Sequence, residues 1–142
     1  MTIAQIIDGR EQQIITCTPA QTVREAARLL ADNRIGCLPV LENGTVAGIF
    51  SERDLLYCVA REGATVLDRP VREVMTAPAI TIDKTVDALE ALSLMTRRRI
   101  RHLPVMEAGE LVGFVSIGDL VKFRMDRIEH EAEQMRHYIT QA

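Results

Sequence analysis

The chain has 142 residues, of which 47% are hydrophobic and 26% charged, and its formal net charge is −3. This length and composition suit a single globular domain with a substantial core. A net negative charge gives nucleic acid no general electrostatic attraction, so a nucleic-acid-binding protein is not expected.

Three widely spaced cysteines, none in a CxxC pair, argue against a disulfide framework and against a zinc site. We therefore expect no bound metal and a reducing, cytoplasmic location. No apolar run approaches the roughly 18 residues that span a membrane. The first residues also lack the charged and apolar regions of a secretory signal, so no membrane association is expected.

The chain begins with a short lead-in at residues 3–7, a strand predicted at residues 14–17 and an amphipathic helix. In that helix, apolar side chains recur at helical spacing: Val23, Ala26, Ala27 and Leu30. Thr22 and Glu25 have the spacing of a capping box, which predicts that the helix begins just after Thr22.

A hairpin is predicted next, between residues 38 and 50. Pro39 cannot donate to a sheet ladder, so its strand should lie at an edge or carry a bulge. Asn43-Gly44 predicts a type I′ turn, in which both central residues have a positive φ. Ser51 then opens a second helix.

The same order of elements returns in the second half of the chain. Residues 48–55 return as 113–120, and residues 35–40 return as 100–105 at the same interval. Two copies are too few for a solenoid, so we predict a closed pair of β-α-β-β-α units around a pseudo-twofold axis. Any ligand site would then also occur twice. A two-residue length difference between the copies is predicted near residues 83–87, where a Thr-Val pair recurs out of step.

The last segment is predicted to be a long helix with apolar residues at heptad spacing. These residues are Val121, Met125, Ile128, Ala132, Met135 and Ile139. Two interpretations stay open: a terminal helix that packs on its own domain, or a helix that helps two subunits to pair.

The chain contains two copies of one pattern: h-x-h-P-V, then a glycine-containing hairpin, then G-h-h-[ST]-x-x-D-h. Over about residues 3–124, this duplicated pattern resembles tandem CBS (cystathionine-β-synthase) domains. The resemblance implies an α+β fold with two β-α-β-β-α motifs, each holding a three-stranded sheet and two helices. The motifs would pack sheet to sheet with pseudo-twofold symmetry, and a homodimer is expected. The predicted divisions are motif 1 with its lead-in at 1–68, motif 2 at 69–124 and a C-terminal helix at 125–142.

The resemblance also implies that adenosine-containing ligands bind in two clefts between the motifs. AMP is the first candidate, and ADP, ATP and NAD(H) are alternatives. The predicted function is that of a stand-alone regulatory protein, which senses energy or redox state and acts on an unidentified protein target. No GxxxxGK[ST], HExxH or GxSxG motif is present, so no enzymatic activity is expected. The alternative function is a structural homodimerisation scaffold with degenerate ligand sites.

Two strand-to-helix corners carry the residues that could hold a nucleotide. Ser51 and Asp54 lie at the first corner, and Ser116 and Asp119 at the second. A helix N-terminus and a serine hydroxyl favour a phosphate, and a carboxylate can accept hydrogen bonds from ribose hydroxyls. Ser-x-x-Asp is also a capping arrangement. We expect Asp119 to bind ligand, and both roles stay open for Asp54.

The two copies differ before the Leu-Pro-Val strand. Copy one has Gly36-Cys37, whereas copy two has Arg101-His102, which could hold a phosphate together with Arg99. The clefts should therefore be inequivalent, with one cleft richer in cations. The sequence leaves open which Ser–Asp corner shares a cleft with Arg101. Adenine is expected against apolar walls and backbone groups contributed by Ile15, Thr16, Ile35, Pro39, Ile80, Thr81 and Pro104.

Overall fold

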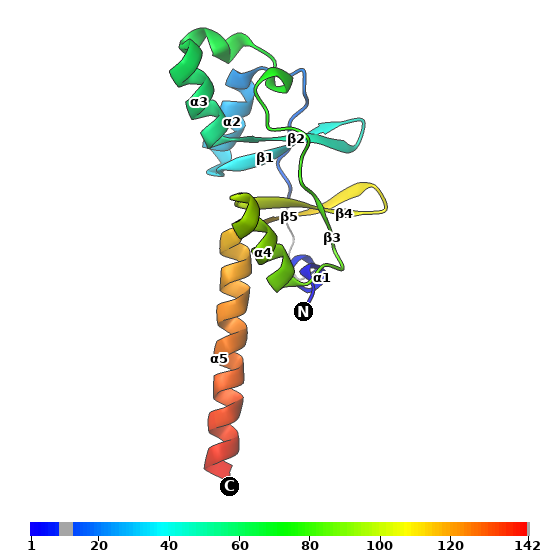
Figure 1. The fold of residues 1–142 in the computed structure, drawn as a ribbon, viewed down its shortest axis with the longest axis vertical. Helices are drawn as coiled ribbons and strands as arrows, with labels where there is room; N and C mark the ends of the chain where they lie inside the picture. The colour runs from blue at the N-terminus through cyan, green and yellow to red at the C-terminus, as the bar shows by residue number, and fades with distance from the viewer. Residues whose placement is uncertain (9–12, 142) are drawn as a thin grey trace.

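The computed structural model describes residues 1–8 and 13–141 and shows an α+β fold with two small sheets (Figure 1). The α-helices are α1 (Ile3–Ile7), α2 (Val23–Asn33), α3 (Glu52–Glu62), α4 (Ala88–Arg98) and α5 (Ile117–Gln141). The strands are β1 (Cys37–Glu42), β2 (Thr45–Ser51), β3 (Ile82–Asp83), β4 (His102–Glu107) and β5 (Glu110–Ser116). Two short 3-10 helices, η1 (Ala64–Asp68) and η2 (Val71–Glu73), join the two halves.

Each half of the chain is built around an antiparallel hairpin. Strands β1 and β2 form one hairpin and β4 and β5 the other, with a register irregularity one residue after each strand proline. Both turns have positive φ at their two central residues, Asn43-Gly44 and Ala108-Gly109, so the predicted turn conformation is confirmed. The two hairpins lie one above the other in Figure 1, and the remaining elements flank them.

The predicted first strand of each copy is shorter than expected. In copy one, Cys17 alone pairs with Val40, and in copy two β3 begins only at Ile82. The strand prolines explain this difference. The Cys17 N–H donates to Pro39 O at 3.2 Å, but parallel pairing upstream would need an N–H that Pro39 lacks.

Helix α2 begins where the sequence predicts, just after Thr22, but the predicted capping box is incomplete. Thr22 Oγ1 accepts a hydrogen bond from Glu25 N at 3.1 Å. The Glu25 side chain is instead bound by Gln21 Nε2 at 3.2 Å, and Asp87 caps α4 through Leu89 N. One orphan N–H of each first turn is therefore satisfied by its N-cap residue.

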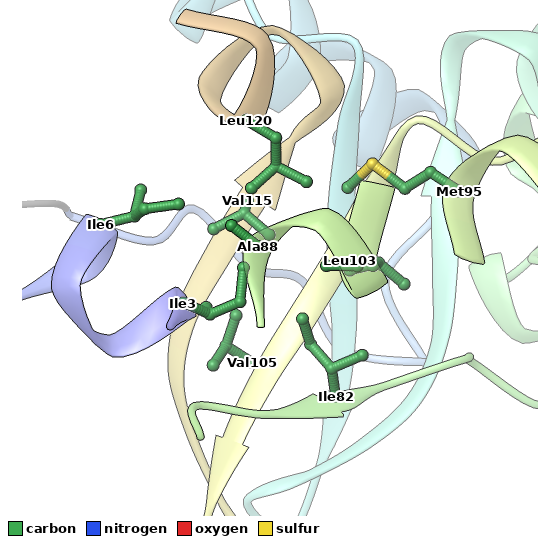
Figure 2. Close-up of a cluster of buried hydrophobic side chains, with 10 residues drawn as sticks. Ile3, Ile6, Ile82, Ala88, Met95, Leu103, Val105, Val115 and Leu120 are labelled. Carbon is green, nitrogen blue, oxygen red and sulfur yellow. The ribbon is translucent and has the colours of Figure 1, made fainter. Parts of the chain in front are cut away.

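The lead-in segments are exchanged between the halves. Ile3 and Ile6 of α1 are buried in the core of the second copy, shown in Figure 2. Val71 of η2 is fully buried in the core of the first copy, where Val74 and Met75 pack against it. The divisions predicted at 1–68 and 69–124 group each lead-in with the copy that follows it in the sequence. In the structure, each lead-in instead completes the core of the other copy. The predicted boundary at 125 falls inside the continuous helix α5.

The predicted two-residue length difference near residues 83–87 is wrong. The bridge residue Cys17 is the repeat partner of Ile82, and the N-cap Thr22 is the repeat partner of the N-cap Asp87. Both pairs are separated by the same number of residues as the hairpins, so no insertion lies between strand and helix. The copies instead differ in the distance from lead-in to first strand. Ile7 and Met75 occupy equivalent places beside a strand glycine, yet Ile7 precedes Cys17 by more residues than Met75 precedes Ile82.

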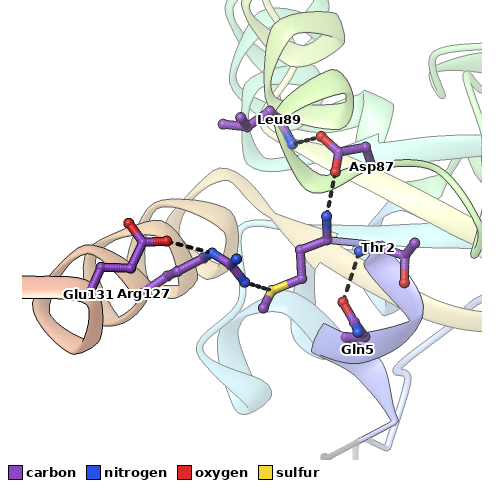
Figure 3. Close-up of polar contacts among 7 residues, drawn as sticks. Thr2, Gln5, Asp87, Leu89, Arg127 and Glu131 are labelled. Atoms are coloured by element: carbon purple, nitrogen blue, oxygen red, sulfur yellow. Dashed lines mark hydrogen bonds and ion pairs between the residues drawn. The ribbon is translucent and has the colours of Figure 1, made fainter. Parts of the chain in front are cut away.

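Polar contacts also bind the N-terminus to the second copy (Figure 3). The Met1 amino group donates to Asp87 Oδ1 at 2.7 Å, and Arg127 of α5 donates to Met1 Sδ at 3.2 Å. Beyond this point α5 projects away from the two hairpins (Figure 1). The interpretation that the terminal helix packs on its own domain therefore holds for its first turns only, as far as the contact of Arg127. Across the part of the chain that the structure describes, no helix combines the length and the apolar character that crossing a bilayer requires.

Candidate ligand-binding cleft

A cleft of about 240 Å³ lies between the two copies. Its walls come from the Ser51–Asp54 corner, from the segment that leads into β3 and from the turn between α4 and β4. The lining residues are Gly36, Cys37, Ile49, Ser51, Glu52, Arg53, Asp54, Thr76, Pro78, Ala79, Ile80, Arg99, Ile100, Arg101 and His102. The structure thus answers the open question: the first corner shares a cleft with Arg101.

The corner at the end of β2 is a complete capping box. Ser51 N and Ser51 Oγ donate to Asp54 Oδ2 at 2.9 and 3.0 Å, and Asp54 N donates to Ser51 Oγ at 3.2 Å. Thr76 Oγ1 donates to Asp54 Oδ1 at 3.0 Å. Asp54 therefore caps α3 and lines the cleft at once. Its Oδ1 is held by one hydroxyl from the neighbouring segment, which a ribose hydroxyl could replace.

The opposite wall carries the cations. Arg99 is the left-handed C-cap residue of α4, with φ 54°, and Arg101 follows two residues later. Within residues 1–8 and 13–141, neither arginine forms an ion pair with a carboxylate. With Arg53, the cleft has three guanidinium groups against the carboxylates of Glu52 and Asp54. Its net positive charge suits a ligand that carries a phosphate.

His102 is held in place by its neighbours. Its ring stacks on Phe114 with the centroids 5.4 Å apart, and it lies opposite Ser116 in the β4–β5 pair. Burial lowers the pKa of His102 from its ordinary value of 6.5, although the carboxylate of Asp119 acts in the opposite direction. At neutral pH the imidazole is therefore uncharged. It offers one N–H donor and adds no positive charge to that of the arginines.

This depressed pKa makes a prediction about stability. The unfolded chain binds the His102 proton more readily than the folded chain does, so the stabilisation is complete above pH 6.5 and is lost as the pH falls. Between about pH 7 and about pH 5, the melting temperature of His102→Gln should fall less steeply than that of the unchanged protein. His137→Gln, on an exposed part of α5, is the control and should follow the unchanged protein. Parallel melting curves for His102→Gln and the unchanged protein would contradict the assignment.

Cys37 occupies the place in copy one that His102 occupies in copy two. It is buried, and burial together with the carboxylates of Asp54 and Glu52 raises the pKa of its thiol to about 12. Such a thiol stays protonated and serves as a small apolar wall rather than as a nucleophile. All three cysteines are free and buried.

The second corner is also a capping box but does not line this cleft. Ser116 N donates to Asp119 Oδ2 at 2.8 Å, and Asp119 N donates to Ser116 Oγ at 3.1 Å. Of the predicted adenine-wall residues, Ile80 lines the cleft. The others lie outside its lining: Ile15, Thr16, Ile35, Pro39, Thr81 and Pro104. A role for these residues and for Asp119 remains a prediction for the pseudo-symmetric position.

Several lining residues were missed from the sequence. Thr76, Pro78 and Ala79 belong to the link between the copies, which carries no repeat signal. Ile100 could have been found, because it is the repeat partner of Ile35, which was predicted to contact the base. Within residues 1–8 and 13–141, no group of three or more His, Cys, Asp or Glu side chains could hold a metal ion.

Comparisons with known proteins identify the family. The family model for the CBS domain matches residues 10–61 and 71–126. The "CBS domain-containing protein YhcV" of Bacillus subtilis is 32% identical over 126 residues, which cover 87% of each chain. The crystal structure of the CBS-domain-containing protein ATU1752 from Agrobacterium tumefaciens is 36% identical and superposes with a TM-score of 0.82, covering 87% of this chain and 99% of that one.

A third relative was solved with a ligand. It is the CBS domain protein PAE2072 from Pyrobaculum aerophilum, complexed with AMP. It is 30% identical, with a TM-score of 0.74, and the match covers 84% of this chain and 89% of that one. The duplicated hairpins, the two strand-to-helix corners and the family match lead to one conclusion: this chain belongs to the CBS domain family and carries two CBS domains in tandem.

Proposed function

We propose that this protein is a non-catalytic regulatory module that binds an adenosine-containing ligand in the cleft between its two CBS motifs. AMP is the first candidate, and ADP, ATP and NAD(H) are alternatives. Occupancy of the cleft would report energy or redox state to a protein partner in the cytoplasm. The AMP complex of the Pyrobaculum aerophilum relative supports this choice of ligand.

One observation carries the proposal: the cleft joins an acidic corner from one motif to cationic side chains from the other. Asp54 would accept hydrogen bonds from ribose hydroxyls, and its Thr76 contact shows that Oδ1 faces a hydroxyl donor. Arg101 would hold the phosphate with its guanidinium fork, and His102 would add one N–H donor. Ile49, Ile80 and Ile100 offer apolar surface for the base.

The arrangement also explains why ligand binding could be regulatory. The acidic corner and the cations belong to different motifs, so a bound nucleotide would tie the two motifs together. A ligand that binds the folded form stabilises it by roughly 2.7 kcal/mol at about 100 times its dissociation constant. The output would be a change in the relative position or rigidity of the two motifs, read by the partner.

Thermal melting with AMP, ADP, ATP, NAD(H) and S-adenosylmethionine tests the proposal. At about 100 times the dissociation constant, at least one of these ligands should raise the melting temperature by roughly 5–10 °C for a domain of this size. Inorganic phosphate and adenine at the same concentration are controls for binding by one part of the ligand alone. No shift with any of the five would reject the sensor function and favour the alternative, a homodimerisation scaffold with degenerate ligand sites.

A further inference from the structure

Helix α5 carries an apolar stripe that is exposed along most of its length among the residues that the structure describes. The stripe consists of Val121, Met125, Ile128, Ala132, Met135 and Ile139. Exposure is 42% at Val121 and is highest near the end of the stripe, with 63% at Met135 and 66% at Ile139. A row of apolar side chains over about 27 Å of helix is costly in water unless another surface covers it.

The stripe is separate from the face that α5 uses to pack on its own domain. Leu120 is buried in the core of the second copy, Phe123 packs against that core, and Arg127 contacts Met1 (Figure 3). At 3.6 residues per turn, the centre of the stripe lies roughly 100–160° around the helix from these residues. A partner could therefore cover the stripe while the existing contacts of α5 stay in place.

The charges beside the stripe identify the partner as a second copy of this chain. The stripe residues alternate in steps of four and three, as the a and d positions of a coiled coil do, with Met125 at a and Ile128 at d. The flanking g positions are then Arg124 and Glu131, and the flanking e positions include Glu129 and Arg136. In a parallel, in-register pair, each g residue faces the e residue five positions later in the other copy.

A parallel pair makes every charged contact of this kind attractive. Arg124 of one copy faces Glu129 of the other, and Glu131 faces Arg136. The twofold axis repeats both contacts. These pairs cross between helices, so they contribute to orientation as well as to attraction.

An antiparallel pair of the same stripes has the opposite pattern. Reversing one stripe places Met125 against Met135 and brings like charges together at the flanks. Glu129 then meets Glu129 of the other copy, Glu131 meets Glu131, and Lys122 meets Arg136. Like charges held directly opposite one another are unfavourable, so this orientation is disfavoured.

We propose that the stripes of two copies pair as a parallel, in-register, two-stranded coiled coil. This inference is independent of the ligand cleft, because none of the residues involved lines it. Glu131 at present accepts from Arg127 Nε within the same helix at 3.2 Å. An exposed pair of this kind contributes little, so exchanging it for the contact with Arg136 costs little.

Disulfide trapping tests the orientation. Met135 is a d residue, so Met135→Cys should form an intermolecular disulfide with its counterpart, which only a parallel pair places opposite it. The native cysteines are 2%, 5% and 9% exposed, so the new thiol is the accessible one. The control is His137→Cys, two residues along on the outer face, which should give little cross-linked product under the same oxidation.

Charge reversal tests the specificity on the Met135→Cys background. Glu129→Arg with Glu131→Arg makes all four cross-helix contacts repulsive, and so does Arg124→Glu with Arg136→Glu. Each charge variant alone should dimerise through the stripe with a dissociation constant raised roughly tenfold or more, given ~0.3–0.5 kcal/mol for each pair. A mixture of the two should restore cross-linking, and only as the heterodimer, because all four contacts are again attractive.

These outcomes separate the possible occupants of the stripe. Efficient cross-linking at position 135, lost on charge reversal and restored by mixing, supports the proposal. Cross-linking between Met125→Cys and Met135→Cys chains, but not at 135 alone, would show an antiparallel pair and overturn it. A monomeric full-length chain by light scattering, or cross-linking equal to the His137→Cys control, would overturn it as well. Cooperative melting of every variant checks that the domain remains folded.

Discussion

Replacing Arg101 by alanine is expected to weaken AMP binding roughly 10- to 100-fold, since a hydrogen bond to a charged group contributes ~1.5–3 kcal/mol and 1.4 kcal/mol is a factor of ten. Arg101 lines the cleft and has no ion-pair partner among the described residues, so its loss should leave the fold intact. Titration calorimetry measures the affinity. The matched control is Arg98→Ala, because Arg98 is the last residue of α4 and does not line the cleft. This variant should bind AMP like the unchanged protein.

The pseudo-symmetry of the chain provides a second control for the same site. Asp54 and Asp119 each accept a hydrogen bond from the backbone N–H of their N-cap serine, so alanine at either position should cost about 1 kcal/mol of stability. Only Asp54 lines the cleft with Arg101. Asp54→Ala should therefore lose binding to this cleft, whereas Asp119→Ala should keep it. The reverse result would show that the ligand uses the second corner.

Gly48→Ala is expected to destabilise the protein by about 1–3 kcal/mol, because it forces a side chain into a closely packed site. A Cβ at residue 48 would lie 2.8 Å from Thr76 O and 2.8 Å from Met75 Sδ. Thr76 is backbone-paired to Ile49 in both directions, so it cannot move without breaking that pairing. The melting temperature should fall by roughly 3–10 °C, and AMP binding should weaken because Thr76 lines the cleft.

Gly113→Ala is the matched control for this substitution. Gly113 is the repeat partner of Gly48, but the nearest atoms to its Cβ would be side-chain atoms of Ile7 at 3.1 Å, with Val105 Cβ at 3.5 Å. A side chain can shift by a few tenths of an ångström, so the loss of stability should be clearly smaller and AMP binding should be unchanged. Equal losses from the two substitutions would mean that the contact with the Thr76 carbonyl does not limit the packing.

The repeat made the local structure of each motif predictable from the sequence. The hairpin turns, the helix starts and the serine–aspartate corners all depend on residues close together in the chain, and the structure has them where the pattern places them. The first strands were overestimated because the sequence does not show that they pair in parallel with the proline-bearing strand, where the missing N–H ends the ladder.

The assembly of the cleft could not be predicted, because it depends on contacts between the copies. Each lead-in packs on the opposite core, which brings residues 76–80 across to the Ser51–Asp54 corner. Sequence reasoning favoured Asp119 as the ligand residue, whereas Asp54 is the one that lines the same cleft as Arg101. The repeat relates the two serine–aspartate corners to each other, but it does not show which of them faces the turn that carries Arg99 and Arg101.

One cleft is expected to hold the two ends of a nucleotide with side chains from different motifs. A crystal structure of the protein grown with AMP tests it directly. We predict ligand density in the cleft, with the ribose hydroxyls hydrogen-bonded to Asp54 and the phosphate within reach of Arg101. Density for AMP at another place on the protein, with Asp54 still bonded to Thr76 and the cleft unoccupied, would contradict the account.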